Sequence, residues 1–170
     1  MDYFEDIFER LGEGSAERGE FAIMAPFVFE ENRVHLLFEV RSYNLRRQPG
    51  EVCFPGGRIE KTEEPRECAV RETSEELGIP EKRIRLIGNV GSMYSLLNEK
   101  INVFAGEIRE YEDKKTEANP DEVHEVFTVP FEFFVKQGPK ESYNFDGHYI
   151  WGLTARAVNE ILKLCGEGLK

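Results

Sequence analysis

Apolar residues alternate with polar ones, or gather in short runs, along much of the chain. These runs predict strands at Phe21–Phe29, Val34–Val40, Ile84–Val90, Ile101–Ile108 and Val123–Val129. The charged segment Glu30–Arg33 separates the first two runs and is typical of a hairpin turn. We therefore expect a sheet whose first two strands form a hairpin.

Three other segments carry apolar residues at helical spacing, namely Tyr3–Leu11, Pro65–Leu77 and Thr154–Leu164. In the second, Pro65 suits the first helical turn, and Gly78 with Pro80 just beyond it marks the end. Lys114–Glu122 is a polar segment and predicts a loop that reaches an active site.

Length and composition limit the class of protein. A chain of 170 residues with 40% hydrophobic residues predicts one folded domain over residues 1–170 and argues against wholesale disorder. No uncharged run approaches the roughly 20 apolar residues of a membrane span. The acidic start MDYFEDIFER is unlike a secretory leader, so we expect a cytoplasmic protein without a membrane partner.

Charge and cysteine content exclude further classes of site. A formal net charge of −11 opposes binding to nucleic acid. The segment Arg41–Arg58 is the local exception, because it holds four arginines and only Glu51 as an acid. Three widely spaced cysteines, Cys53, Cys68 and Cys165, indicate neither a disulfide framework nor a zinc site, so we expect them to be reduced and partly buried.

Three carboxylates share one face of the predicted helix Pro65–Leu77. Glu72, Glu75 and Glu76 lie within an arc of about 100° at 100° per residue, while the apolar residues lie on another side. Like charges at these spacings destabilise a helix, and a hard divalent cation would compensate for them. The alternative is an acidic face that is simply solvated.

The sequence around this helix resembles the Nudix hydrolase motif. GRIEKTEEPRECAVRETSEELGI, here called the box (Gly57–Ile79), fits the pattern G-x5-E-x7-R-E-U-x-E-E-x-G-U, in which U is a bulky apolar residue. One position departs, since Thr73 stands where the pattern has an apolar residue. The resemblance implies an α/β/α sandwich with a mixed sheet and a loop-helix-loop motif that binds Mg²⁺ or Mn²⁺. It also implies cleavage of a diphosphate linked to another moiety.

The same resemblance assigns roles to residues of the box. Glu72, Glu75 and Glu76 correspond to the metal-bound carboxylates, and the carbonyl of Gly57 joins them. Arg71 corresponds to a structural arginine that points away from the metal and pairs with a loop carboxylate such as Glu63. For the catalytic base we consider Glu72 and the loop residue Glu122, and a solvated surface position is the alternative for Glu122.

A second resemblance lies just before the box. LLFEVRSYNLRRQPGEVCFPGGR (Leu36–Arg58) is similar to the extended motif of coenzyme A pyrophosphatases, roughly LLTxRSxxLRxHxGxVxFPGGR. Gln48 and Glu60 depart from it, replacing a histidine and an aspartate; the later run IWGLTARAV (Ile150–Val158) also resembles this subfamily. The residues expected to bind the phosphates of a substrate are Arg41, Ser42, Arg46, Arg47 and Arg58.

These resemblances imply hydrolysis of coenzyme A or its thioesters to adenosine 3′,5′-bisphosphate and 4′-phosphopantetheine or its acyl form. The expected partner is thus a small nucleoside diphosphate derivative, and a homodimer stays open. Two alternatives remain: a Nudix hydrolase for ADP-ribose or NADH-type dinucleotides, and a catalytically silent module that binds a nucleotide. The intact set Glu72, Glu75 and Glu76 argues against the silent module.

Overall fold

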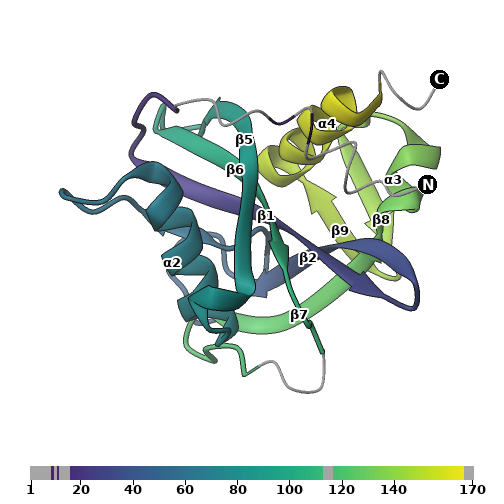
Figure 1. Ribbon diagram of the computed structural model, residues 1–170, viewed down its shortest axis with the longest axis horizontal. Helices are drawn as coiled ribbons and strands as arrows, with labels where there is room; N and C mark the ends of the chain where they lie inside the picture. The colour runs from purple at the N-terminus through teal and green to yellow at the C-terminus, as the bar shows by residue number, and fades with distance from the viewer. Residues whose placement is uncertain (1–8, 10, 12–15, 113–116, 167–170) are drawn as a thin grey trace.

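The computed structural model describes residues 9, 11, 16–112 and 117–166. The elements are, in chain order, β1 (Phe21–Glu30), β2 (Arg33–Arg41), β3 (Val52–Cys53), β4 (Gly56–Arg58), α2 (Pro65–Leu77), the 3-10 helix η1 (Glu81–Arg83), β5 (Ile84–Tyr94), β6 (Lys100–Ile108), β7 (Val123–Pro130), α3 (Phe131–Gln137), β8 (Ser142–Phe145), β9 (His148–Trp151) and α4 (Gly152–Gly166) (Figure 1).

A seven-stranded mixed sheet forms the centre of the molecule. Its main path runs β3-β2-β1-β6-β5, with β4 beside β1 and β7 beside β2. The pair β1 and β6 is parallel, and the other strand pairs of this sheet are antiparallel. The predicted hairpin of β1 and β2 is confirmed, because Glu30 pairs with Arg33 across a two-residue turn.

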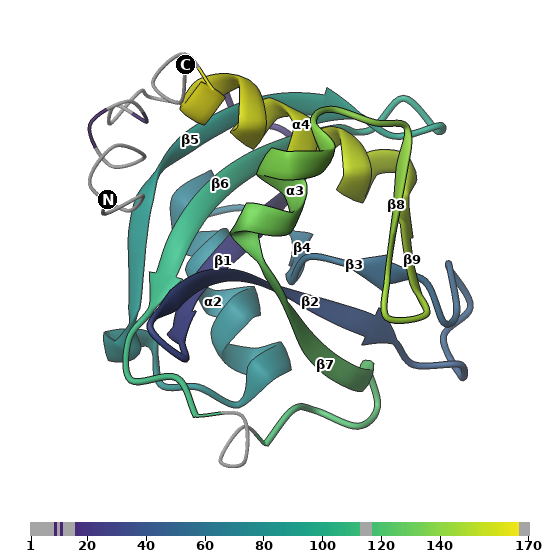
Figure 2. The same cartoon turned by 90° about the vertical axis from the view of Figure 1, so that its right-hand side faces the viewer.

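Helices cover both faces of this sheet, with α3 and α4 on one face and α2 on the other (Figure 2). Strand β6 alternates accordingly: Val103 and Ala105 belong to the buried cluster that includes α4, whereas Phe104 and Ile108 belong to the cluster that includes α2. The predicted α/β/α sandwich with a mixed sheet is therefore confirmed.

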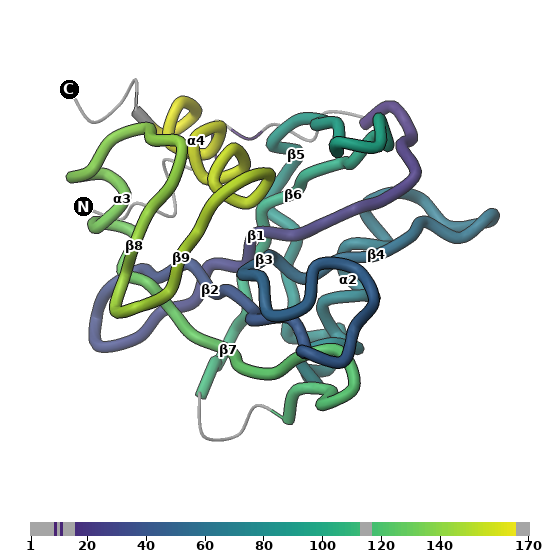
Figure 3. The backbone as a smooth tube through the Cα atoms, turned by 180° about the vertical axis from the view of Figure 1, so that it is seen from behind, coloured from purple at the N-terminus to yellow at the C-terminus, as the bar shows by residue number. Residues whose placement is uncertain are grey.

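Strands β1 and β2 separate beyond their hairpin, and β3 and β4 fill the gap (Figure 3). β1 pairs with β2 from Phe27 to Glu30 but with β4 from Phe21 to Ile23. β2 in turn pairs with β3 through Glu39 and Val40. The turn that joins β3 to β4 thus lies in the middle of the sheet, where α2 packs.

The short elements are the ones that the sequence pattern did not reveal. Strands β3, β4, β8 and β9 and helix α3 were not predicted, whereas each predicted strand and the two later helices are present within a few residues of the expected bounds. The predicted helix Tyr3–Leu11 lies, apart from Glu9 and Leu11, outside the described residues.

The cysteines are placed as the sequence predicts. Cys53 is half-buried, Cys68 and Cys165 are buried, and all three are free thiols, as predicted. Within the described residues, no helix is both long and apolar enough to cross a membrane.

Candidate active site

Helix α2 carries the carboxylates, and its two ends are set by local sequence. Pro65 occupies the first turn, where its missing N–H costs nothing. Gly78 ends the helix in the left-handed conformation, with φ of 64°, and its N–H donates to the carbonyl of Ser74. A Cβ at Gly78 would come within 2.1 Å of the Glu117 carbonyl oxygen, so glycine lets the loop before β7 close over the helix end.

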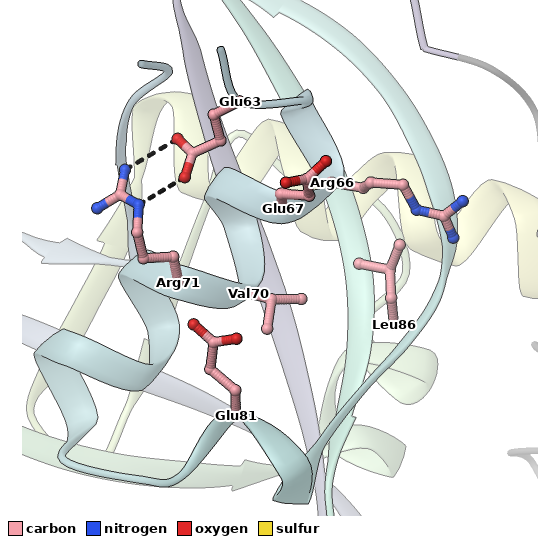
Figure 4. A pocket seen from close by; sticks show the side chains of 7 residues that line it. All are labelled: Glu63, Arg66, Glu67, Val70, Arg71, Glu81 and Leu86. Atoms are coloured by element: carbon pink, nitrogen blue, oxygen red, sulfur yellow. Dashed lines mark hydrogen bonds and ion pairs between the residues drawn. The ribbon is translucent and has the colours of Figure 1, made fainter. Parts of the chain in front are cut away.

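Arg71 holds the loop before the helix through Glu63. Its Nε and Nη2 atoms donate to the Glu63 carboxylate at 2.6 and 3.0 Å (Figure 4). The second carboxylate oxygen also accepts the N–H of Glu60 at 3.2 Å. These contacts, led by the hydrogen bond from Arg71, lower the pKa of Glu63 to about 2. The ion pair expected between the two residues is therefore present.

Arg71 does not point away from the acidic face, contrary to our expectation. Its Nη1 atom donates to Glu72 at 3.0 Å and to Glu75 at 3.2 Å. The reason is the fork of the guanidinium group, which offers N–H bonds on two edges and can bridge carboxylates on both sides. Arg71 thus connects the loop residue Glu63 with two of the three helix carboxylates.

Glu72 lies directly against the backbone of Gly57. A Cβ added to Gly57 would come within 2.5 Å of the Glu72 carboxylate, so only glycine allows this approach. Burial is the largest influence on Glu72 and raises its pKa, although Arg71 acts in the opposite direction. Beneath them the buried Cys68 thiol lies 3.6 Å from the Gly57 carbonyl oxygen.

Glu76 is the most buried of the three helix carboxylates, with only 8% of its surface exposed. Its Oε2 accepts the N–H of Gly56 at 3.3 Å. Its other close neighbour is Glu39 of strand β2, which is 3% exposed and which sequence analysis missed. Burial and the charge of Glu39 both raise the pKa of Glu76 well above that of a free carboxyl.

The loop before β7 lies against the same carboxylates. The N–H of Asn119 donates to the Glu76 carbonyl at 2.9 Å, and the N–H of Ser42 donates to the Glu122 carbonyl at 2.9 Å. The side chain of Glu122 is exposed, yet its charge contributes to the raised pKa of Glu39, Glu72 and Glu76. Glu122 is therefore close enough to act electrostatically on Glu39, Glu72 and Glu76.

The arginines of the segment Arg41–Arg58 differ in the hydrogen bonds and ion pairs that they already make. Arg41 uses Nε and Nη2 to donate to the carbonyl of Arg47, at 3.3 and 3.1 Å, and so shapes the arginine loop (Arg41–Glu51). Arg47 and Arg58 both face Glu99, at 3.7 and 3.9 Å. Arg58 also lies 4.6 Å above the ring of Phe21.

Arg46 and Ser42 are the remaining residues expected at the substrate site. Arg46 is exposed and has no hydrogen bond or ion pair within the described residues. Ser42 is buried, and its hydroxyl oxygen accepts the N–H of Asn44 at 3.3 Å. Arg46 is thus available to an external anion, whereas the Ser42 hydroxyl stabilises the loop.

The donor chemistry around Gly57 suits a hard divalent cation. Glu72 lies against the Gly57 backbone, Glu76 lies against that of Gly56, and carboxylate and carbonyl oxygens are the ligands such cations prefer. The described residues contain no group of three histidines, cysteines or acids placed to hold a metal as they stand. Here Glu72 and Glu75 bond to Arg71 and Glu76 to Gly56, so closure around an ion requires rotation of these side chains.

A hollow of about 400 Å³ lies elsewhere, on an outer side of α2 (Figure 4). Its lining is mainly charged and consists of Glu63, Arg66, Glu67, Val70, Arg71, Glu81 and Leu86. It includes none of Glu72, Glu75 and Glu76, but it is lined by Arg71, which donates to Glu72 and Glu75, so it adjoins the carboxylates without containing them.

Relatives and solved structures place this arrangement in a known family. The family described as "NUDIX domain" matches residues 21–147. Nudix hydrolase 3 of Caenorhabditis elegans is 32% identical over 130 residues, covering 75% of this chain and 54% of that protein. The peroxisomal coenzyme A diphosphatase NUDT7 of Mus musculus is 32% identical over 119 residues, covering 68% and 49%. The chain spans about half the length of these two relatives.

The fold comparison agrees with the sequence comparison. A crystal structure of a C. elegans Ap4A hydrolase binary complex superposes with a TM-score of 0.62 at 14% identity, covering 88% of this chain and 97% of that one. The matched family segment contains β1 to β8, the whole of α2 and each of the carboxylates described above. The chain therefore belongs to the Nudix family.

Proposed function

We propose that this protein hydrolyses the diphosphate bond of coenzyme A or its thioesters, releasing adenosine 3′,5′-bisphosphate and 4′-phosphopantetheine or its acyl form. The observation that carries the proposal is the continuity of Leu36–Arg58, which runs from β2 through the arginine loop to Gly57, against which Glu72 lies. This segment resembles the coenzyme A pyrophosphatase motif. The similarity to the mouse coenzyme A diphosphatase supports the same substrate.

The proposed metal ligands are Glu72, Glu75, Glu76 and the carbonyl of Gly57, with Mg²⁺ or Mn²⁺ as the cation. When bound, the cation neutralises diphosphate charge and makes water a better nucleophile. Arg71 and Glu63 act in this proposal by fixing the loop that presents Gly57. The close approach between Glu72 and the Gly57 backbone supports this ligand set.

Glu72 and Glu122 are the proposed candidates for the general base. Glu72 lies against the Gly57 backbone, beside the proposed metal position, so its carboxylate can accept a proton from a water molecule there. Glu122 is exposed on the loop that covers the carboxylates, so it can accept a proton from a water molecule on the solvent side. Either residue then returns the proton to solvent after the bond to phosphorus has broken.

The arginine loop is the proposed site for the phosphates of the substrate. Coenzyme A carries a 3′-phosphate in addition to its diphosphate, and arginine matches phosphate geometry with two parallel N–H bonds. Arg46 has no partner to give up within the described part of the chain, whereas Arg47 and Arg58 would exchange Glu99 for a phosphate. Arg41 and Ser42 keep the loop in shape for these contacts.

A direct assay separates this proposal from its alternatives. The purified protein is incubated with Mg²⁺ or Mn²⁺ and, separately, coenzyme A, dephospho-coenzyme A, ADP-ribose and NADH, and the products are identified by mass spectrometry. We expect metal-dependent release of adenosine 3′,5′-bisphosphate, with coenzyme A as the best of the four substrates. Preference for ADP-ribose or NADH would favour the dinucleotide alternative. Tight binding without turnover of any substrate would favour the silent module.

A further inference from the structure

Strand β2 places an acidic side chain inside the protein, next to the box. Glu39 is 3% exposed, and its Oε1 atom has no hydrogen-bond partner among the described residues. Its Oε2 atom receives a long contact from the thiol of Cys53, at 3.9 Å. A buried carboxylate oxygen without a partner loses its hydration and gains nothing in return, which is costly for a folded protein.

The second carboxyl of this buried pair carries a cost of its own. Glu76 lies beside Glu39 and shares a hydrogen bond with it; the charge of Glu39 and this bond raise the pKa of Glu76, while the same bond lowers the pKa of Glu39. The charge of Glu122 acts on both residues in the same direction. Arg41 opposes this effect at Glu39, but its guanidinium group is hydrogen-bonded to the carbonyl of Arg47. Within the part of the chain that the structure describes, no cation is therefore in contact with either carboxylate of the pair.

We propose that Glu39 and Glu76 together bind a divalent cation, so that a residue of strand β2, outside the box, is a metal ligand of this protein. The inference rests on the proposed metal binding by the box and extends its ligand set. Two carboxylates are enough, because Mg²⁺ and Mn²⁺ sites are commonly completed by water and by substrate phosphate oxygens. The partnerless Oε1 of Glu39 supplies the free oxygen that such a site needs.

The nature of the cation follows from the neighbours of the pair. Carboxylate oxygens favour hard cations, whereas a thiolate would favour softer metals. The Cys53 thiol already donates to Glu39 Oε2 at 3.9 Å, so it acts as a weak donor toward this carboxylate rather than as a metal ligand.

Mn²⁺ binding tests the proposal without reference to turnover. Free Mn²⁺ is measured by electron paramagnetic resonance during titration of the metal-free protein at pH 7.5, for wild type, Glu39→Gln and Glu72→Gln. Glu160→Gln is the matched control, because Glu160 is a surface carboxylate of α4 that pairs with Lys163. We expect Glu39→Gln to weaken Mn²⁺ binding at least about tenfold and Glu160→Gln to leave it unchanged.

The outcomes separate this proposal from the proposed function. If Glu72→Gln weakens Mn²⁺ binding and a folded Glu39→Gln does not, Glu39 is no ligand and the inference fails alone. If neither variant changes binding, the metal site of the box fails as well. Should Glu39→Gln not fold by circular dichroism, anomalous diffraction from wild-type crystals soaked in Mn²⁺ decides: density between Glu39 and Glu76 supports the site, and its absence there overturns it.

Discussion

Glu76 is a carboxylate whose ionisation is opposed both by burial and by the charge of a neighbouring carboxylate. In the metal-free protein it faces Glu39, and both carboxyls have raised pKa values because of burial. A group whose pKa is higher in the folded than in the unfolded state costs stability as the pH rises above its unfolded value of about 4.5. At neutral pH this cost is therefore present.

Glu76→Gln removes the charge and almost none of the volume. We expect the metal-free variant to unfold at a higher temperature than wild type at pH 7 in EDTA, by the equivalent of about 1–2 kcal/mol. Turnover with saturating Mg²⁺ should fall by at least about a hundredfold, since a proposed metal ligand is lost. Calorimetry and a steady-state assay measure the two effects, and wild-type turnover in this variant would exclude Glu76 as an essential ligand.

Glu63 has the opposite dependence on pH. The hydrogen bond from Arg71 lowers its pKa to about 2, so the stability it contributes is present above pH 4.5 and disappears as the pH falls toward 2. We expect Glu63→Gln to be less stable than wild type by about 2 kcal/mol at pH 6, the size of a charge-assisted hydrogen bond. Urea titrations should show this difference shrinking between pH 4.5 and 2.5. A difference that is constant over this range would contradict the assignment.

The residues of the box could be identified from sequence, but their neighbours could not. Spacing alone indicated that Glu72, Glu75 and Glu76 share a helix face. Glu39 gave only a weak signal, a single acid within the apolar run of β2, and pairing across strands decides where it points. The predicted direction of the Arg71 side chain was wrong. The angle around a helix fixes where the Cα and Cβ atoms lie, but it does not fix which partners the end of a long side chain reaches.

At the level of elements, the C-terminal end of α2 packs against the loop that carries Glu122. Gly78 combines a left-handed backbone with a Cβ position 2.1 Å from the Glu117 carbonyl oxygen. Gly147, in the turn between β8 and β9, has a similarly positive φ of 82° but open space around it. Substitution of Gly147 therefore measures backbone strain alone, whereas substitution of Gly78 measures backbone strain together with the steric clash.

Gly78→Ala should destabilise the protein by about 2–3 kcal/mol, from roughly 1 kcal/mol of backbone strain plus displacement of the loop. Gly147→Ala should cost only the strain, about 1 kcal/mol. Urea denaturation of both variants measures the difference. Equal losses would mean that the loop moves away from the helix end without cost.

The longer elements were predictable because each repeats its pattern over several residues. α2 was predicted with its observed bounds, since proline and glycine mark its ends. The strands β3 and β4 have two and three residues, too few for any period to show. They exist because the divergence of β1 and β2 leaves backbone groups to pair, which is a property of the assembled sheet.

On the scale of the whole molecule, the proposed function requires an acidic protein to bind a strongly anionic substrate. The net charge is −11, and the segment Arg41–Arg58, with four arginines and one acid, is the local exception. These arginines are not equally available to a substrate. Arg41 is hydrogen-bonded to the loop backbone, and Glu99 partly neutralises Arg47 and Arg58. Arg46 remains as an exposed cation without a partner in the described chain.

Because Arg46 is the arginine of this segment without a partner among the described residues, we expect it to distinguish coenzyme A from dephospho-coenzyme A. Arg46→Ala should lower kcat/KM for coenzyme A by roughly 10- to 150-fold, because one charge-assisted contact to the 3′-phosphate contributes about 1.5–3 kcal/mol. It should change kcat/KM for dephospho-coenzyme A little, since that substrate lacks the 3′-phosphate. Arg47→Ala serves as the matched comparison and should lose less, because Arg47 must first leave Glu99. Equal losses on both substrates in Arg46→Ala would instead assign Arg46 to the diphosphate, and 3′-phosphate recognition would have to come from another part of the molecule.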